Sequence, residues 1–419
     1  MKKHILSFHI IIIFIGMLYL YGSVSHYFEY WGFTYDLSFN RVLLSIASLL
    51  LITNVFLNGY IYDFVQIFLI YWAFFVIIPI TILFSVSVIN YYHFFLHFSF
   101  ICIIGLLFTL KRQLVFAKNL IKPISFEHNK FLIVLFSLIL SIPLLEVVAN
   151  FNFLSFNLFD VYDIRKASRE SSNTIIGYLK EALSRVVYPF FMIYGYVHKK
   201  LFLLIFGLLG IIVVFASTGA LKSIIAVIPI SFLFIKTVSY KQIQKLLLVL
   251  VYCLVFIPII ETYLFGTFFL TDLPSRRLFF VPGLLENSFL LEYTNNPQLY
   301  MHSILKFFND NPEALARNIG NEYFDRPDMN ANVGVLLDGF INIGYFGVIL
   351  HAIIIYFTIG VLNGVKINPK FFGIFFVYFY YINTSFIGTL FLTHGMFFLL
   401  VFFYITKLTH ENPTHLSKF

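Results

Sequence analysis

The chain has 419 residues, of which 60% are hydrophobic and 11% are charged, and Lys and Arg outnumber Asp and Glu by 28 to 20. Soluble domains carry about 25% charged and roughly 45–50% apolar residues, so this composition excludes a soluble globular domain. It predicts a polytopic membrane protein, a single transmembrane domain whose surroundings are lipid, and we expect no nucleic-acid partner.

The first predicted helix covers residues 5–22 and follows directly on Met1-Lys2-Lys3-His4. A basic start before an apolar run is also typical of a secretory signal peptide. This apolar run is longer than the usual 7–15 residues or so, and no A-x-A-like cleavage site follows it. We therefore expect a retained transmembrane helix.

Twelve transmembrane helices are predicted in an all-α fold, since one span needs about 20 mostly apolar residues. The segments 201–217 and 221–235 are short enough to form a tight hairpin. Cys102 and Cys253 lie inside apolar segments, where we expect them to be buried and unpaired. The other predicted spans cover residues 41–57, 65–88, 93–110, 131–149, 173–197, 246–265, 338–362, 371–388 and 392–407.

The distribution of charge predicts the orientation. The loops on the side of the N-terminus contain 16 of the 28 Lys and Arg residues, so both termini are expected in the cytoplasm. Of the nine arginines, only Arg112 falls on that side. Arg differs from Lys because its planar guanidinium binds phosphate through two parallel hydrogen bonds. The separation of Arg from Lys therefore favours a chemical function at the external face.

Two external segments are larger than the others. Residues 150–172 form a medium loop, and residues 266–337 form a large loop that contains "RRLFFVPGLLENSFLLEY", a segment suited to a helix in the membrane interface. Glu146, Glu261 and Asp338 lie near the outer ends of predicted helices. A charge deep in a bilayer costs at least about 2.5–3.5 kcal/mol, so these carboxylates are expected to face a cavity or a partner.

Several stretches from about residue 130 onward carry a resemblance to a known family. In this order and spacing the chain resembles the oligosaccharide repeat unit polymerases, the Wzy-type O-antigen polymerases. The stretches are "DVYDIR", "GYLKEALSRVVYPFFMIYGYVHKK", "STGALKS", "RRLFFVPGLLENSFLLEY", "FFNDNPEALARNIGNEYF", "NANVGVLLDGFINIGYFGVI" and "NTSFIGTLFLTHG".

The resemblance implies a membrane glycosyltransferase of the GT-C-like type in the cytoplasmic membrane of a bacterium. Its substrates would be two oligosaccharides on undecaprenyl diphosphate. The growing chain passes to a sugar hydroxyl of the acceptor, and undecaprenyl diphosphate leaves. A chain-length regulator is a further partner that the resemblance allows. The products would be O-antigen or a related polysaccharide.

The arginines of the external segments fit this chemistry, because preplaced cations stabilise a diphosphate leaving group. We predict that the diphosphate contacts Arg165, Arg276, Arg277, Arg317 and Lys222, with Arg326 as a further candidate. Salt bridges or lipid headgroups are the alternative partners of each arginine, and snorkelling to the membrane interface is the alternative for Lys222. The Asp-x-Asp of metal-dependent sugar transferases is absent, the nearest patterns being Asp160-x-x-Asp163 and Asp325-x-x-Asp328. We therefore expect no metal and no other cofactor in the reaction.

A base must remove the proton of the acceptor hydroxyl. Asp338, Glu146 and Glu261 are the predicted catalytic carboxylates, and Asp163, Glu322 and His302 are further candidates. In a continuous helix over 334–351, one face holds Gly334, Asp338, Asn342 and Tyr345, and another holds Phe340, Gly344, Gly347 and His351. The first face predicts a cavity wall and the second predicts close helix packing. A helix cap or a structural hydrogen bond is the alternative role for Asp338.

Other interpretations remain open. His93 and His97 are four residues apart and could hold a metal on a helix, but no carboxylate is near them in sequence, so we expect polar residues at the outer interface. A lipid-linked oligosaccharide flippase also has about twelve helices and usually two related halves, whereas this chain has one asymmetric large loop. An O-antigen ligase shares the leaving group and is the nearer alternative.

Overall fold

The structure is a computed structural model, and it describes residues 3–57, 63–110, 179–217, 222–303, 305, 314–327 and 329–406. Regular structure within these ranges is helical throughout. Five of the described helices are long and apolar enough to cross a membrane, namely Ile5–Trp31, Phe64–Ser85, Tyr91–Thr109, Tyr240–Phe265 and Val335–Val365. The prediction of an all-helical membrane protein is confirmed at this level. The predicted span 131–149 and the loop 150–172 lie outside the described residues.

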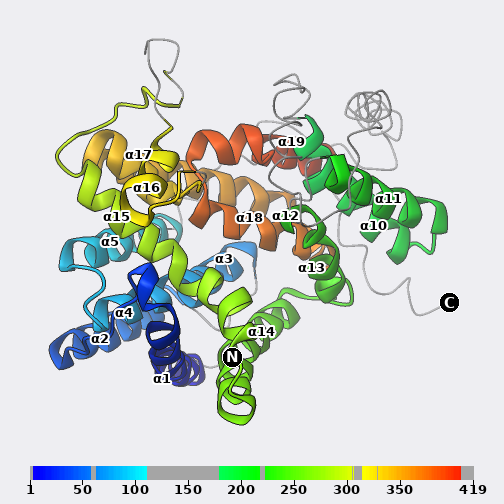
Figure 1. Cartoon of the computed structure of the whole chain (residues 1–419). Helices are drawn as coiled ribbons and strands as arrows, with labels where there is room; N and C mark the ends of the chain where they lie inside the picture. The colour runs from blue at the N-terminus through cyan, green and yellow to red at the C-terminus, as the bar shows by residue number, and fades with distance from the viewer. Residues whose placement is uncertain are drawn as a thin grey trace. The chain divides into compact units, whose positions relative to one another are not determined.

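The chain divides into two compact units, and Figure 1 shows their helices. The first unit consists of Met1–Gln113, Gln244–Ile359 and Ile382–Ile387. Its helices, some of which extend past its limits, are α1 (Lys3–Phe28), η1 (Glu29–Trp31), α2 (Phe39–Val55), α3 (Phe64–Trp72), η2 (Ala73–Ile77), α4 (Ile78–Ser85), α5 (Tyr91–Thr109), α14 (Tyr240–Phe265), η5 (Thr271–Phe280), α15 (Val281–Tyr293), α16 (Leu315–Phe324) and α17 (Val335–Val365).

The core of the first unit is the helical run Phe64–Ser85, formed by α3, η2 and α4. Its sequence is apolar on all sides, which is the pattern of a helix with no face toward water. The most apolar part of this run is completely buried. It is enclosed by α1, α2 and α5 and by the helix that η5 and α15 form together. The segment 276–293 is therefore a helix, as predicted, and it packs into this unit.

Helix α1 has one buried face and one exposed apolar face. Ile13 and Met17 are completely buried, whereas Phe8, Ile15 and Tyr19 on the opposite side are about 60% exposed, at 62%, 59% and 63%. A soluble protein rarely leaves such a large apolar surface uncovered, so this face fits contact with lipid. Cys253 of α14 is likewise exposed and Cys102 is half-buried, so the prediction that both cysteines are buried is wrong for Cys253 and only partly met by Cys102.

Helix α17 is two helices joined by a sharp bend at Ile343 and Gly344. Gly344 has φ +63° and ψ −147°, a combination that residues with a Cβ rarely adopt. After the bend, Gly347 lies against the backbone of Gly339. In a straight helix these residues would lie about 12 Å apart. The predicted continuous span 338–362 is therefore wrong.

The bend also changes which residues share a face. Asn342 still donates to the carboxylate of Asp338 at 2.9 Å, as their i, i+4 spacing predicts. Tyr345 lies beyond the bend, is 55% exposed and packs on the rings of Tyr92 and Phe340. Its predicted place beside Asp338 on a cavity wall is wrong, because the helix ends before it.

The second unit consists of Leu114–Ile243, Gly360–Tyr381 and Gly388–Phe419. Gly195 and Gly207 bring two of its helices into backbone contact, since a Cβ on either one would meet the facing main chain at 2.3–2.5 Å. These helices, α10 and α11, lie side by side in Figure 1. Its described helices are η4 (Leu183–Val187), α10 (Tyr188–Val197), α11 (Leu201–Ser217), α12 (Lys222–Ile225), α13 (Val227–Phe234), η7 (Pro369–Phe371), α18 (Phe372–Thr384), η8 (Thr389–Thr393) and α19 (Met396–Thr406).

The predicted span 221–235 is broken, because α12 ends at Ile225 and α13 begins at Val227. Two loops that were predicted on the same side of the membrane meet in this unit. Thr237 donates to the carbonyl of Pro369 at 3.0 Å, and the Tyr240 hydroxyl donates to the carbonyl of Ile367 at 2.5 Å. The two loops therefore lie next to each other in the second unit.

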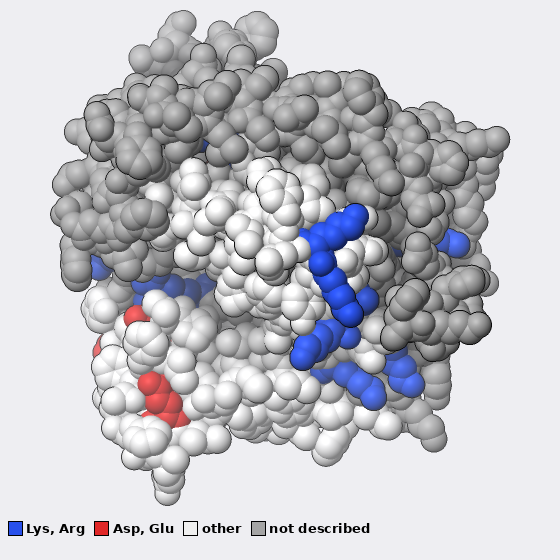
Figure 2. Space-filling view, turned by 90° about the vertical axis from the view of Figure 1, so that its right-hand side faces the viewer, with Lys and Arg blue, Asp and Glu red and all other residues white. Residues whose placement is uncertain are grey.

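Exposed lysines lie in these two loops and in the loop between α10 and α11. Lys and Arg side chains gather in one region of the face drawn in Figure 2, where few acidic side chains are seen. The exposed lysines of the three loops are Lys199, Lys200, Lys236 and Lys366, and Lys241 is exposed in the first turn of α14. Their position between helices fits the positive flanks that orient membrane helices toward the cytoplasm.

Candidate functional site

Arg276 lies on η5, the π-helical segment that continues into α15. The carboxylate of Asp272, one turn earlier, accepts hydrogen bonds from Nε of Arg276 at 2.8 Å and from Nη2. Arg276 is 4% exposed, and its Cζ lies 4.2 Å from the ring centre of Phe28 and 5.2 Å from that of Trp31. The guanidinium is thereby held in a cage of one carboxylate and aromatic rings, and its Nη1 has no partner among the described residues.

Trp31 also receives a second guanidinium. The Cζ of Arg326 lies 4.3 Å from the centre of the indole, and within the described residues Arg326 has no carboxylate partner. Arg326 directly follows Asp325, whose left-handed φ of +50° ends α16. Two like charges beside one ring repel each other unless an anion compensates them. Arg276, Trp31 and Arg326 are called the arginine–tryptophan site below.

The other predicted cations differ in environment. Arg277 is exposed on η5 next to Arg276, and Arg317 is exposed on α16; neither forms an ion pair within the described part of the chain. Lys222 begins α12, but its side chain lies outside the described part. Arg165 lies there as well. Of the cations predicted to contact the diphosphate, Arg276 and Arg326 both lie against the ring of Trp31. Arg277 follows Arg276 directly in the sequence.

Glu261 has a structural partner for each of its carboxylate oxygens. Oε1 accepts from the hydroxyl of Thr267 and the amide of Phe269, both at 3.1 Å, and Oε2 accepts from the amide of Leu270 at 2.8 Å. These amides lie where the next helical segment begins, and its first N–H groups have no intrahelical acceptor. Glu261 therefore caps the segment that leads into η5.

Asp338 is a buried hub of hydrogen bonds with an exposure of 2%. Its Oδ1 accepts from Asn342 at 2.9 Å, and its Oδ2 accepts from the amide of Ile387 at 2.7 Å. The side-chain oxygen Oδ1 of Asn342 in turn accepts from the backbone amide of Tyr300 at 2.6 Å. Asp338 thus fixes two loops to the first half of α17, and Glu146, the third predicted base, lies outside the described residues.

Tyr300 and His351 extend this network. The Tyr300 hydroxyl and Nε2 of His351 are 2.8 Å apart, and Nδ1 of His351 lies 2.6 Å from the carbonyl oxygen of Val335. Because a carbonyl only accepts, Nδ1 carries the proton and Nε2 accepts from the tyrosine. Burial and then the charge of Asp338 raise the pKa of Tyr300, so its hydroxyl remains a donor.

The second unit contains a polar cluster that the sequence-based prediction missed. Arg185 is 4% exposed, pairs with Glu181 at 2.7 Å and donates to Nδ1 of His394. Its Cζ lies 4.5 Å from the ring centre of Tyr381, and the hydroxyl of Tyr378 donates to the carbonyl of His394 at 2.7 Å. The i, i+4 spacing of Glu181 and Arg185 is the signal that could have indicated a buried pair.

The prediction also missed Glu286. This carboxylate is 1% exposed and lies against His93 and His97, which are buried as well, so the two histidines face the protein interior. Burial opposes the charge of Glu286, but the two imidazoles outweigh it and lower the pKa of this carboxyl to about 2. Nothing in the local sequence indicates this contact, because 189 residues separate His97 from Glu286.

Comparison of the chain with protein-family models, with curated proteins and with solved structures finds no match. The class that the composition and the described helices define is a helical membrane protein. The more particular assignment therefore depends on the sequence resemblance and on the chemistry of the sites described above.

Proposed function

We propose that this protein polymerises oligosaccharide repeat units carried on undecaprenyl diphosphate, at the external face of a bacterial cytoplasmic membrane. The proposal starts from the resemblance to Wzy-type polymerases and from the concentration of arginines in segments predicted to be external. In this proposal the arginine-rich segments are external, and the lysine-rich loops of the second unit lie on the cytoplasmic side, as the positive-inside rule favours.

The arginine–tryptophan site is the observation that carries the proposal. Two guanidinium groups from segments fifty residues apart in sequence share the indole of Trp31, and only Arg276 has a carboxylate partner among the described residues. A diphosphate is the kind of anion that arginines bind through two parallel hydrogen bonds. In the proposed reaction, negative charge develops on the leaving undecaprenyl diphosphate, and these cations stabilise it without a metal.

The structure suggests different roles for neighbouring arginines. Arg277 is exposed and unpaired within the described residues, so in this proposal it contacts the diphosphate directly. Arg276 is enclosed by Asp272 and aromatic rings, so it holds η5 in place and adds positive charge behind Arg277. Arg326 supplies further positive charge beside Trp31.

The carboxylates also separate by role. Both oxygens of Asp338 and of Glu261 accept hydrogen bonds from the protein, so these residues fit the positioning of loops better than proton removal. In this proposal the acceptor proton passes to another carboxylate. Glu146 is the remaining member of the predicted catalytic set, and Asp163 and Glu322 are the further candidates from sequence. Asp338 then acts by fixing the segment around Ile387 and the turn at Tyr300.

The test is polymerisation by purified protein in liposomes, with a labelled repeat unit on undecaprenyl diphosphate as substrate. Arg277→Ala should abolish chain extension and leave folding unchanged, and Arg277→Lys should restore little, because an ammonium lacks the planar fork. Lys236→Ala removes an exposed lysine from a lysine-rich loop and serves as the matched control with full activity. Full activity of Arg277→Ala would remove the proposed diphosphate contact.

The same assay run with EDTA examines the metal-free part of the proposal. Chain extension in EDTA is expected, because arginines supply the charge stabilisation. A requirement for added Mg²⁺ or Mn²⁺ would instead assign Asp325 and Asp328, or Asp160 and Asp163, as ligands of a catalytic ion.

A further inference from the structure

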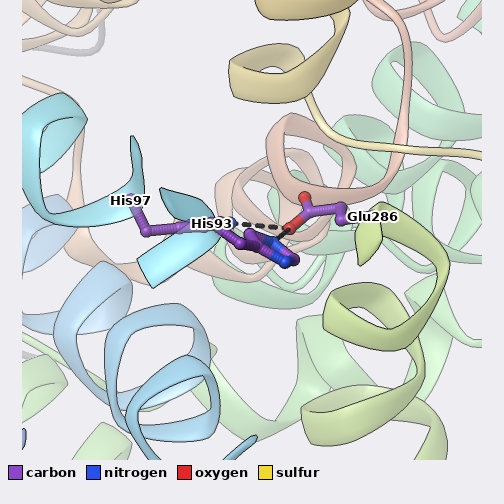
Figure 3. A group of neighbouring side chains, drawn as sticks. All are labelled: His93, His97 and Glu286. Carbon is purple, nitrogen blue, oxygen red and sulfur yellow. Dashed lines mark hydrogen bonds and ion pairs between the residues drawn. The ribbon is translucent and has the colours of Figure 1, made fainter. Parts of the chain in front are cut away.

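His93, His97 and Glu286 form a compact buried cluster in the first unit. The two histidines are four residues apart on α5 and therefore lie on one face of that helix. Glu286 reaches them from α15, and Figure 3 shows all three side chains pointing to one another. Their exposures are 0%, 1% and 1%. One potential ligand atom from each residue lies within 4.8 Å of the other two.

The hydrogen bonds within the cluster leave it incomplete. Both imidazoles approach the same carboxylate oxygen, with Nε2 of His97 at 2.6 Å and Nε2 of His93 at 3.2 Å from Oε2 of Glu286. The other oxygen, Oε1, is buried and has no partner in the described structure, and neither has Nδ1 of His93 or of His97. A buried polar atom without a partner costs about 1–3 kcal/mol.

Three potential lone-pair donors within 4.8 Å of one another are an arrangement that can hold a metal ion. Zn²⁺ binds His nitrogen at about 2.0–2.1 Å and carboxylate oxygen at about 2.0–2.2 Å, so ligands around a tetrahedral ion lie about 3.3 Å apart. The separation of 3.2 Å already lies within about 0.1 Å of this value, and the separation of 2.6 Å would have to lengthen by about 0.7 Å. Two His and one Glu are also an established ligand set for Zn²⁺.

We infer that His93, His97 and Glu286 bind a divalent transition-metal ion, with Zn²⁺ as the ion that the ligand set favours. The charge of the cluster supports this assignment. Within the described residues, the only groups paired with the Glu286 carboxylate are the two imidazoles. A buried carboxylate needs a cation as compensation, and a divalent ion supplies it without protonating either histidine.

The ion would join two helices that are far apart in sequence. It would fix α5 to α15, and α15 continues directly from η5, which carries Arg276 and Arg277. The site is therefore structural and takes no part in the proposed transfer chemistry. It stands apart from the polymerase proposal, because its test measures metal content and stability and needs no substrate.

The test uses full-length protein purified with a tag that contains no histidine, and the metal content is measured by inductively coupled plasma mass spectrometry. The parent protein should retain about one Zn²⁺ per chain after dialysis. Glu286→Gln keeps a hydrogen-bond acceptor but loses the charged ligand, and its affinity for Zn²⁺ should fall at least about tenfold. His26→Ala removes an exposed histidine of α1 and should leave the metal content unchanged.

Glu286→His distinguishes a metal site from a hydrogen-bonded cluster. Three histidines still form a zinc site, so this variant should keep both the ion and the thermal stability of the parent protein. If the three residues formed only a hydrogen-bonded cluster, Glu286→His would lose the carboxylate acceptor and its thermal stability would fall. Glu286→Gln would then keep a thermal stability close to that of the parent protein. Loss of Zn²⁺ in Glu286→Gln together with retention in Glu286→His supports the inference. Absence of Zn²⁺ from the parent, or retention in Glu286→Gln, overturns it.

Discussion

Replacing Gly347 by Ala should separate the two halves of α17. A Cβ built on Gly347 would lie 1.9 Å from the carbonyl oxygen of Gly339 and 2.5 Å from its carbonyl carbon. The neighbour is main chain, which cannot rotate away as a side chain does. Ordinary contact begins at 3.4 Å, so the two backbones would have to move apart by about 1.5 Å.

The expected loss of stability is the sum of two destabilising contributions and one stabilising contribution. Overpacking typically costs about 1–3 kcal/mol, and separating the halves of α17 also breaks the hydrogen bond between His351 and the carbonyl of Val335, worth about 1 kcal/mol. Ala favours the helix over Gly by about 1 kcal/mol. The net destabilisation of Gly347→Ala should therefore be about 1–3 kcal/mol.

Gly364 is the matched control, because it lies in the same helix and a Cβ there would meet nothing within 4 Å. Gly364→Ala should raise the stability by about 0.5–1 kcal/mol. Reversible denaturant unfolding of the purified protein in detergent measures both variants. Equal stability of Gly347→Ala and Gly364→Ala would contradict the close backbone contact, and a continuous helix over 335–365 would then be the better description.

Three further outcomes are expected. Asp338→Ala should lower the stability by about 2–4 kcal/mol, because the buried amide of Ile387 and the side chain of Asn342 lose their acceptor; thermal unfolding in detergent measures it, and a parent-like midpoint would contradict the hub. Arg276→Ala should lower the unfolding midpoint clearly and Arg277→Ala hardly at all, as measured side by side, whereas the reverse order would remove the distinction between a caged and a free arginine. Asn296→Cys should react with a membrane-impermeant maleimide added outside intact spheroplasts; reaction only after lysis would place residues 266–337 in the cytoplasm.

The helices of this protein could be predicted because their signal is local. Apolar segments long enough to span a bilayer predict α1, α5 and α14, and the described helices begin and end within a few residues of those predictions, except that α1 and α14 extend about six residues further at one end. The bend of α17 was missed because Gly344 in an apolar segment is equally typical of close helix packing. Only the conformation, φ +63°, distinguishes the two uses of the glycine.

Much of the polar organisation could not be predicted, because it depends on contacts between distant segments. Glu286 was assigned to an amphipathic external segment, and its position beside His93 follows from the packing of α15 against the core of the first unit. On the helix face that holds Asp338, the predicted neighbour Asn342 is confirmed by its hydrogen bond to the carboxylate. Its bond to the amide of Ile387 involves main chain, which has no signature in the side-chain pattern.

The most direct test of the polymerase function is the analysis of surface glycan and lipid-linked intermediates from a strain that lacks this protein. We expect carriers and surface glycan with a single repeat unit, reaching the outside of the membrane, and no ladder of longer chains, because all of the proposed chemistry is external. Long polymer still attached to its lipid carrier would contradict a polymerase and favour a ligase. Repeat units held on the cytoplasmic side would contradict it equally and favour a flippase.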